Sequence, residues 1–471
     1  MRLLVLLLCG LLGAPVLAQD PLPSSVGNAL RAAGISAASV GIVVRDAATG
    51  DTRLAVNAGQ PMNPASLMKL VTTFAGLELL GPAYTWKTTV WSAAPIEDGV
   101  LKGDLVIRGS ADPKLTFEQF WLLLRQLRGR GIREIEGDLV LDRSLLAVND
   151  HDSPTFDDKP LRPYNVSPDA LLLNFKTLRL TLLAEPERKQ VQLLAEPEPA
   201  NLDITNLIRP SNGSCGDWKE NLRADLTQHG GRWRLILTGT LPASCGEKNW
   251  YLGVLPHADY VRGVFEQLWR ELGGSWRGNV RDGSVPPDAR QLALIESPAL
   301  AELVRDINKF SNNVMARQLF LTIGAEGGRH PARTEDADAA VRTWLAEREL
   351  RFAELVLDNG SGLSRRERIS ADSLARLLAA AWRSPVMPEL MASLPLVAVD
   401  GTMKKRLKND GVAGQAHIKT GTLEGVKAIA GYVLDRNGRQ QIIVFLVNHA
   451  NAQSAQSAQD ALLAWVYAGM R

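Results

Sequence analysis

The stretch Pro64-Ala65-Ser66-Leu67-Met68-Lys69 opens an apolar pattern of helical period that runs to Gly81-Pro82, where a helix must end. Ser66 then lies at a helix N-terminus, where free N–H groups and the partial positive charge of the helix favour a developing alkoxide. Lys69 follows three residues later and therefore shares a helix face with Ser66. The stretch predicts a reactive serine with an amine beside it.

Lys69 can take the Ser66 proton only as a neutral amine. A free lysine has a pKa of about 10.4 and is protonated at neutral pH, so burial and a second nearby cation must lower the pKa of Lys69. The alternative is that Ser66 caps the helix and Lys69 lies in solvent. A Ser-x-x-Lys pattern does not decide between the two, because about one or two occurrences are expected by chance in a chain of this length.

The stretch Ser311-Asn312-Asn313 lies between two apolar segments of helical period, 300–307 and 314–321, and is predicted to form the turn between two helices. Ser311 is expected to pass a proton between Lys69 and a leaving amine. The amide of Asn313, with donors and an acceptor, suits the peptide backbone of a substrate. Ordinary turn chemistry is the alternative interpretation of the same residues.

The stretch Lys419-Thr420-Gly421-Thr422 falls on a predicted strand that borders the same cleft. Lys419 is the expected second cation, and Gly421 lets another backbone approach closely because it has no side chain. The hydroxyls of Thr420 and Thr422 suit a terminal carboxylate, and the N–H groups of Thr422 and Ser66 are predicted to form an oxyanion hole. The alternative is an edge strand with a solvated lysine.

The fold class follows from what flanks these motifs. Strand patterns occur at both ends of the chain and predict one five-stranded antiparallel sheet from residues 39–45, 52–56, 416–420, 426–434 and 441–447. A helix over 454–467 is expected to cover one face of it. If Ser66 and Ser311 share a site, they must meet although a long segment separates them, so that segment must leave the domain and return. We therefore predict an α+β catalytic domain formed by residues 19–85 and 286–471, with an insert at 86–285.

The insert has its own pattern of strands and helices. Strands are predicted at 88–91, 104–108, 137–141, 178–183, 191–194 and 233–237, and helices at 116–128 and 260–272. Thr116 and Gly273-Gly274 mark helix ends. The insert is therefore predicted to be mixed α+β with mostly antiparallel pairing.

The N-terminus predicts export. Arg2 precedes a short apolar run that closes with Val16-Leu17-Ala18, the pattern of a cleavable signal peptide over residues 1–18. The run is too short for a membrane span, which takes about 20 apolar residues. Lipid attachment at Cys9 is the alternative, although Leu8 stands where such a site carries Gly or Ala. We expect a periplasmic protein.

Removal of the signal peptide leaves Cys215 and Cys245, and an even pair in an exported chain indicates one disulfide. Two free thiols are the alternative. No metal site is predicted, because no histidine stands at ligand spacing beside either cysteine and the chain lacks His-Glu-x-x-His. The composition has 45% hydrophobic and 22% charged residues and a net charge of +2, which argues against disorder and nucleic-acid binding. No cofactor is expected.

The three motifs together resemble the signature of penicillin-binding proteins and class A β-lactamases, with Asn312 where the signature has Asp. Over nearly the whole mature chain, the sequence resembles the class C low-molecular-mass penicillin-binding proteins, which are D-Ala-D-Ala carboxypeptidases and often endopeptidases. Four further stretches carry this resemblance: Gly109–Leu115, Asn359–Arg365, Asp400–Met403 and Gly414–Val433. The long insert after the first motif separates the chain from β-lactamases.

The resemblance implies a penicillin-recognising domain interrupted by two nested smaller domains, with at most peripheral membrane association. The implied substrates are peptidoglycan stem peptides, cleaved at a terminal D-Ala, at a cross-link or at both, with β-lactams as covalent inhibitors. Carried over by motif, Ser66 is the nucleophile, Lys69 the base, and Ser311 and Lys419 relay protons. The residues implied to bind substrate are Asn313, Thr420, Gly421 and Thr422.

A second hypothesis is a non-catalytic peptidoglycan-binding or scaffold protein that retains the fold and acts through its inserted domains. All four residues implied in catalysis are intact, which favours the enzyme, because a decayed site would be free to lose them.

Overall fold

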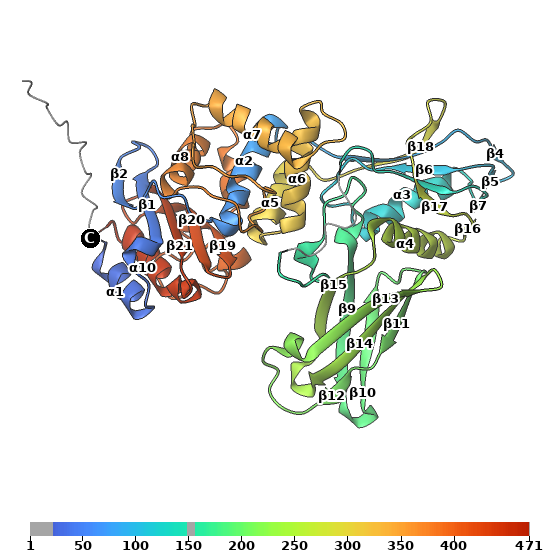
Figure 1. Ribbon diagram of the computed structural model, residues 1–471, viewed down its shortest axis with the longest axis horizontal. Coiled ribbons are helices and arrows are strands. Elements are labelled where there is room, and N and C mark those ends of the chain that lie inside the picture. Colours follow the sequence, from blue (N-terminus) through green and yellow to red (C-terminus); the bar gives the residue numbers. More distant parts are fainter. Residues whose placement is uncertain (1–21, 148–155, 471) are drawn as a thin grey trace, which may run out of the picture.

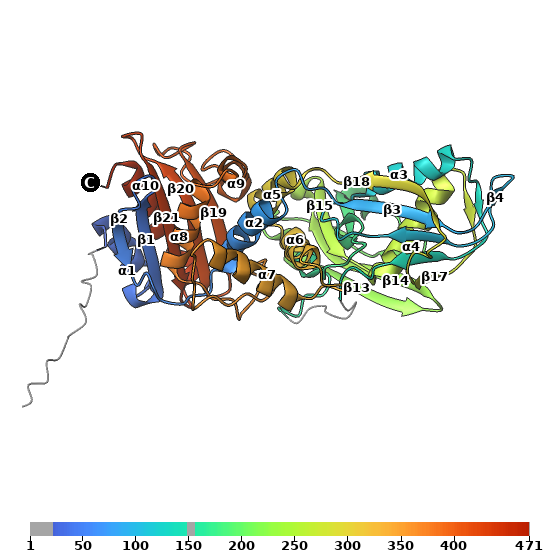
Figure 2. The same ribbon diagram turned by 90° about the horizontal axis from the view of Figure 1, so that it is seen from above.

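The computed structural model describes residues 22–147 and 156–470, and the predicted signal peptide at 1–18 lies outside them. Figures 1 and 2 show an elongated molecule. The sheet that both ends of the chain build lies at one end of it, the insert lies at the other, and helices α5 (Leu300–Lys309) and α6 (Asn313–Glu326) lie between them.

The catalytic sheet has the order β19-β20-β21-β1-β2, and all its pairings are antiparallel. Its strands are β1 (Val40–Asp46), β2 (Thr52–Val56), β19 (Ala416–Leu423), β20 (Val426–Leu434) and β21 (Gln440–Asn448). Strand β1 from the start of the chain pairs with β21 from its end. The predicted five-stranded antiparallel sheet and the α+β class are confirmed.

Helices cover both faces of this sheet. On β21, Ile443, Phe445 and Val447 pack into one cluster with α1 (Ser24–Ala32) and α10 (Gln456–Tyr467). The alternate residues of β21 pack into a second cluster on the other face. The helices that contribute to it are α2 (Met68–Leu79), α5, α6, α7 (Thr334–Glu347), α8 (Ala371–Trp382) and α9 (Met387–Ser393). A strand that is buried on both faces is expected to be a continuous apolar run. Residues 442–447 of β21 form such a run.

The first part of the insert is a five-stranded sheet of order β17-β8-β6-β3-β18. It contains β3 (Lys87–Ser92), β6 (Leu105–Arg108), β8 (Leu139–Asp142), β17 (Val280–Asp282) and β18 (Arg290–Glu296). The pairing in this sheet is mixed: β8 pairs in parallel with β6 and β17, whereas β3 pairs antiparallel with β6 and β18. One prediction is wrong here. Because β18 pairs with β3, the chain returns to the catalytic domain after Glu296 and not at residue 286.

Two helices and a smaller sheet complete this part. Helix α3 (Phe117–Gly129) begins at Thr116, whose side chain forms a capping box with Gln119, as the predicted start at that residue requires. Helix α4 is His257–Glu271. The smaller sheet has the order β16-β7-β5-β4 and consists of β4 (Ile96–Glu97), β5 (Val100–Leu101), β7 (Glu134–Ile135) and β16 (Ser275–Trp276).

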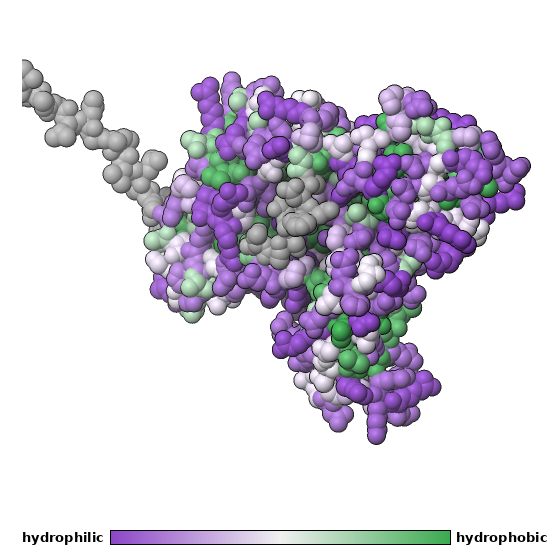
Figure 3. Space-filling view, turned by 45° about the vertical axis from the view of Figure 1, so that its right-hand side comes forward, coloured by the Kyte–Doolittle hydropathy of each residue, from purple (hydrophilic) through white to green (hydrophobic). Residues whose placement is uncertain are grey.

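The second part of the insert, residues 177–253, projects from the molecule as the green strands of Figure 1. Its strands are β9 (Thr177–Glu185), β10 (Gln190–Glu196), β11 (Leu202–Asn206), β12 (Arg209–Ser211), β13 (Leu222–His229), β14 (Arg232–Pro242) and β15 (Lys248–Gly253). A disulfide joins Cys215 to Cys245. The surface in Figure 3 is mostly hydrophilic, with an apolar patch on this projecting part. Its core is continuous with that of α3 and α4.

Phe445 lies in the middle of the catalytic sheet with no exposed surface. We expect Phe445→Ala to destabilise the catalytic domain by about 3–5 kcal/mol, because the substitution removes a buried ring and leaves a cavity. Chemical denaturation followed by tryptophan fluorescence measures the loss. Leu434→Ala, at the exposed end of β20, is the control and should cost less than about 1 kcal/mol. Equal losses of stability in the two variants would contradict the expectation that Phe445 contributes more to the stability of the catalytic domain than Leu434 does.

Candidate active site

Ser66 lies in a single 3-10 turn, Ala65–Leu67, directly before α2. Ala65 has a φ of 46°, a left-handed conformation that needs outside support. Asn63 supplies it, because its Oδ1 accepts the Ala65 N–H at 2.8 Å. Asn448, at the end of β21, holds Asn63 in turn: its Oδ1 accepts the Asn63 N–H at 2.8 Å, and its amide donates to the Asn63 carbonyl at 3.0 Å. The last residue of a sheet strand therefore fixes the turn that carries Ser66.

Three oxygen atoms surround the amine of Lys69, which has no exposed surface. Ser66 Oγ lies 3.0 Å from Lys69 Nζ, and Asn313 Oδ1 lies 2.6 Å from it. The third oxygen is the backbone carbonyl of Ser361. The amide and carbonyl oxygens only accept hydrogen bonds, so they take the two N–H groups of a neutral amine. The lone pair of Lys69 then faces the Ser66 hydroxyl.

The surroundings of Lys69 favour this neutral form. Burial lowers the pKa of Lys69 well below its usual value, and the charge of Lys419 lowers it further. Arg317 of α6 acts in the same direction, while the carboxylate of Glu367 raises the pKa. Lys419, the expected second cation, thus lies close enough to Lys69 to lower its pKa.

The fully buried Lys419 and the half-buried Ser311 form a second pair. Lys419 Nζ donates to Ser311 Oγ at 2.9 Å and to the Thr420 carbonyl at 2.8 Å. Burial lowers the pKa of Lys419 to about 7. Ser311 lies in the turn between α5 and α6, as expected, with a left-handed φ of 56°. Its hydrogen bond is to Lys419, whereas the sequence predicted a link with Lys69.

Two glycines enclose the peptide that leads into Ser66. A Cβ added to Gly421 would lie 2.7 Å from the Pro64 carbonyl and 3.2 Å from Ser66 N. A Cβ added to Gly362 on the other side would lie 2.0 Å from the Ala65 carbonyl. Gly421 therefore brings β19 against the turn that carries Ser66, which is the close approach that its lack of a side chain predicts.

The threonines of the third motif lie at the edge of the site. Strand β19 is an edge strand of the catalytic sheet, and Thr422 is exposed on it. The Thr420 hydroxyl donates to Thr402 Oγ1 at 2.7 Å, which adds a second hydroxyl to this edge. The oxyanion hole of Ser66 N and Thr422 N stays a prediction.

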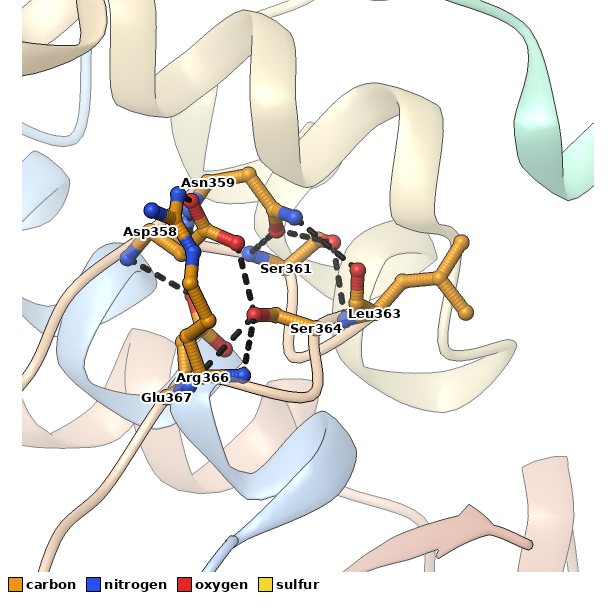
Figure 4. A network of polar contacts seen from close by, with 8 residues as sticks. Asp358, Asn359, Ser361, Leu363, Ser364, Arg366 and Glu367 are labelled. Carbon is orange, nitrogen blue, oxygen red and sulfur yellow. Dashed lines mark hydrogen bonds and ion pairs between the residues drawn. The ribbon is translucent and has the colours of Figure 1, made fainter. Parts of the chain in front are cut away.

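A buried network behind Lys69 was not foreseen (Figure 4). Glu367, with no exposed surface, accepts hydrogen bonds from three consecutive backbone N–H groups, those of Asp358, Asn359 and Gly360. The segment stood out in the sequence only through the resemblance at Asn359–Arg365. Ser361 acts through its carbonyl, which no side-chain motif can reveal.

Among the described residues, no group of three or more histidine, cysteine, aspartate or glutamate side chains is placed to hold a metal ion. In the same part of the chain, none of the helices has the length and apolar character that a membrane crossing requires.

The fold and this site define a serine enzyme with two buried lysines, and comparison with known proteins identifies its class. The sequence profile of the D-Ala-D-Ala carboxypeptidase 3 (S13) family matches residues 22–468. The D-alanyl-D-alanine carboxypeptidase of Actinomadura sp. (strain R39) is 31% identical over 441 residues, which are 90% of this chain and 80% of that protein. The D-alanyl-D-alanine carboxypeptidase DacB of Haemophilus influenzae is 25% identical over 412 residues, covering 87% of this chain and 85% of that protein.

The fold also matches a solved structure. The crystal structure of penicillin binding protein 4 from Haemophilus influenzae superposes with a TM-score of 0.76 at 23% identity, covering 93% of this chain and 99% of that one. The same protein has been crystallised with a β-lactam. The chain belongs to the D-Ala-D-Ala carboxypeptidase 3 (S13) family, which confirms the predicted serine-type carboxypeptidase class and disfavours the scaffold alternative.

Gly421→Ala tests the close approach of β19 to the Ser66 turn. The new methyl group meets the Pro64 carbonyl, so we expect the turn to shift and the rate of acylation by a fluorescent penicillin to fall about 100-fold. Gly59→Ala, where nothing lies within 4 Å of the added carbon, is the matched control. An unchanged rate in Gly421→Ala would contradict the argument.

Proposed function

We propose that Ser66 is the acylated nucleophile of a peptidoglycan carboxypeptidase and that Lys69 is its base. One observation carries the proposal: two acceptor oxygens, Asn313 Oδ1 and the Ser361 carbonyl, take the N–H groups of Lys69, so the lone pair of the amine faces Ser66 Oγ at 3.0 Å. The lowered pKa of Lys69 supports the neutral form that this geometry needs.

In the first half of the reaction, Lys69 takes the proton of the Ser66 hydroxyl while Oγ attacks the carbonyl carbon before the terminal D-Ala. The C–N bond then breaks, and the leaving amine takes a proton from Ser311, which is replenished by Lys419 across their 2.9 Å hydrogen bond. The product of this half is an ester between the substrate and Ser66, together with free D-Ala. We propose that Ser66 N and Thr422 N stabilise the oxyanion.

Between the halves, the proton held by Lys69 passes through solvent to Lys419, which restores both amines. In the second half, water attacks the ester while Lys69 takes one of its protons, and Lys69 then gives that proton to the Ser66 oxygen as the C–O bond breaks. Ser66 regains its hydroxyl, and the shortened peptide loses its acid proton to solvent and leaves as a carboxylate. Thr420 and Thr422 at the edge of β19 are proposed to hold the terminal carboxylate of the substrate, and Asn313 its backbone amide. β-Lactams would acylate the same serine. Residues 1–18 are proposed as the signal peptide that directs the protein to the periplasm.

A cavity beside the site supports endopeptidase activity as a second function. Its volume is about 550 Å³, and it begins at Ser311 and Asn313. Its far wall comes from the insert, through Arg162, Tyr164, Phe175, Lys219, Trp250 and Tyr251. Aromatic surface with two cationic groups suits a peptide that bears carboxylates. We propose that one half of a cross-linked stem-peptide dimer occupies this space.

Ser66→Ala tests the nucleophile. We expect D-Ala release from a pentapeptide to fall about 10⁶-fold and covalent labelling by a fluorescent penicillin to disappear, because the acyl acceptor is gone. Mass spectrometry of the labelled wild-type protein should place the adduct on Ser66. Ser275→Ala, at an exposed serine of the insert, should leave both readouts unchanged. Persistent labelling of Ser66→Ala would refute the assignment.

Tyr251→Ala tests the cavity. Tyr251 is 46% exposed on β15, and its loss should reduce cleavage of cross-linked muropeptide dimers about fivefold, since an aromatic contact contributes about 1 kcal/mol. Release of D-Ala from monomeric pentapeptide should not change. Leu194→Ala, an exposed residue of β10, is the control. An equal loss on both substrates, or on neither, would reject this use of the cavity.

A further inference from the structure

Glu367 is a buried carboxylate behind the site that the proposed mechanism does not use. It is fully buried, and its Oε1 accepts the N–H groups of Asp358, Asn359 and Gly360 at 3.3, 3.1 and 3.1 Å (Figure 4). Burial of a carboxylate is costly unless it is hydrogen-bonded. Three consecutive N–H groups directed at one oxygen are a strong constraint on the conformation of the turn that supplies them.

The turn that Glu367 holds touches the helix of the nucleophile at successive residues. The Gly360 carbonyl accepts the hydroxyl of Thr72 at 2.6 Å. The next carbonyl, that of Ser361, accepts the amine of Lys69. The glycine after it packs against the peptide before the nucleophile. The position of an acceptor for Lys69 is thus set by the residues that Glu367 binds.

We propose that Glu367 is a positioning residue for the base. It holds the Ser361 carbonyl where that oxygen takes one N–H of Lys69, which keeps the amine lone pair directed at Ser66, and its negative charge acts on the buried Lys69. This inference deepens the proposed function and rests on the role of Lys69 as base. A carbonyl held only by a flexible turn would let the amine rotate away from the hydroxyl.

The charges that act on Lys69 come from three elements. Lys419 on β19 and Arg317 on α6 lower the pKa of Lys69, and Glu367 in the turn raises it. Burial, assisted by the charge of Asp358, raises the pKa of Glu367 to about 7, against the three N–H groups that favour its charged form. Removal of the carboxylate charge therefore lowers the pKa of Lys69 further. A base with a lower pKa remains neutral to lower pH.

Glu367→Gln separates the effect of Glu367 on the position of the turn from the effect of its charge on Lys69. The amide keeps an acceptor for the turn but removes the charge, and its new NH₂ group would replace Oε2, which has no hydrogen-bond partner among the described residues. We expect the maximal rate of acylation by a penicillin to fall about tenfold, because the turn is held less firmly. We also expect the acidic limb of the pH–rate profile to move to lower pH by about one unit. Stopped-flow acylation across the neutral range measures both.

Two further variants sharpen the test. Glu367→Asp keeps the charge on a shorter side chain, so the acidic limb should stay near its wild-type position while the maximal rate falls. Glu354→Gln is the matched control: Glu354 also holds a loop, accepting the Ser370 N–H at 3.0 Å and the Ser373 hydroxyl at 2.6 Å. The profile of this control should match the wild type.

An acidic limb that stays in place or moves to higher pH in Glu367→Gln would overturn the proposal. A Glu367→Gln protein without a cooperative unfolding transition would also overturn it, because the carboxylate would then serve the fold as a whole. The adduct on wild-type Ser66 tests the proposed function separately, so the two failures are distinguishable.

Discussion

The enclosure of the Lys69 amine by three oxygen atoms is the interaction on which the site depends. A buried ammonium group is unfavourable, and a buried neutral amine still needs partners for its two N–H groups. Asn313 comes from α6 and Ser361 from the turn before α8, while Ser66 precedes α2. Three separate parts of the chain thus meet at one nitrogen atom, and the helical layer must bring them together before the amine of Lys69 is enclosed.

Close backbone packing is the second constraint. The peptide before Ser66 lies between Gly421 of β19 and Gly362 of the opposite turn, and the side chains of Asn63 and Asn448 hold it from the sheet. Packing this tight transmits small displacements directly to Ser66. The two glycines lack side chains for a physical reason: in each position a Cβ would collide with main-chain atoms.

Much of the fold and of the candidate site could be predicted from the sequence, and the exceptions have identifiable causes. Strands β2 and β20 have the bounds that their patterns predict. The return from the insert was placed too early because β18 reads as an isolated apolar segment, and only its pairing with β3 assigns it to the insert. Glu367 was missed because one charged residue in a polar stretch looks solvated until its burial is known.

Local chemistry predicts the candidate reacting groups: a hydroxyl and an amine three residues apart at the start of a helix, a turn with Ser and Asn, and a strand with Lys and Gly. Those features depend on residue type and short spacing, so the sequence by itself determined them, and with them the family. Tertiary structure alone decided which amine meets which hydroxyl, since Ser311 binds Lys419. It also decided that a backbone carbonyl completes the site, because a carbonyl is present in every residue and only the fold directs one at Lys69.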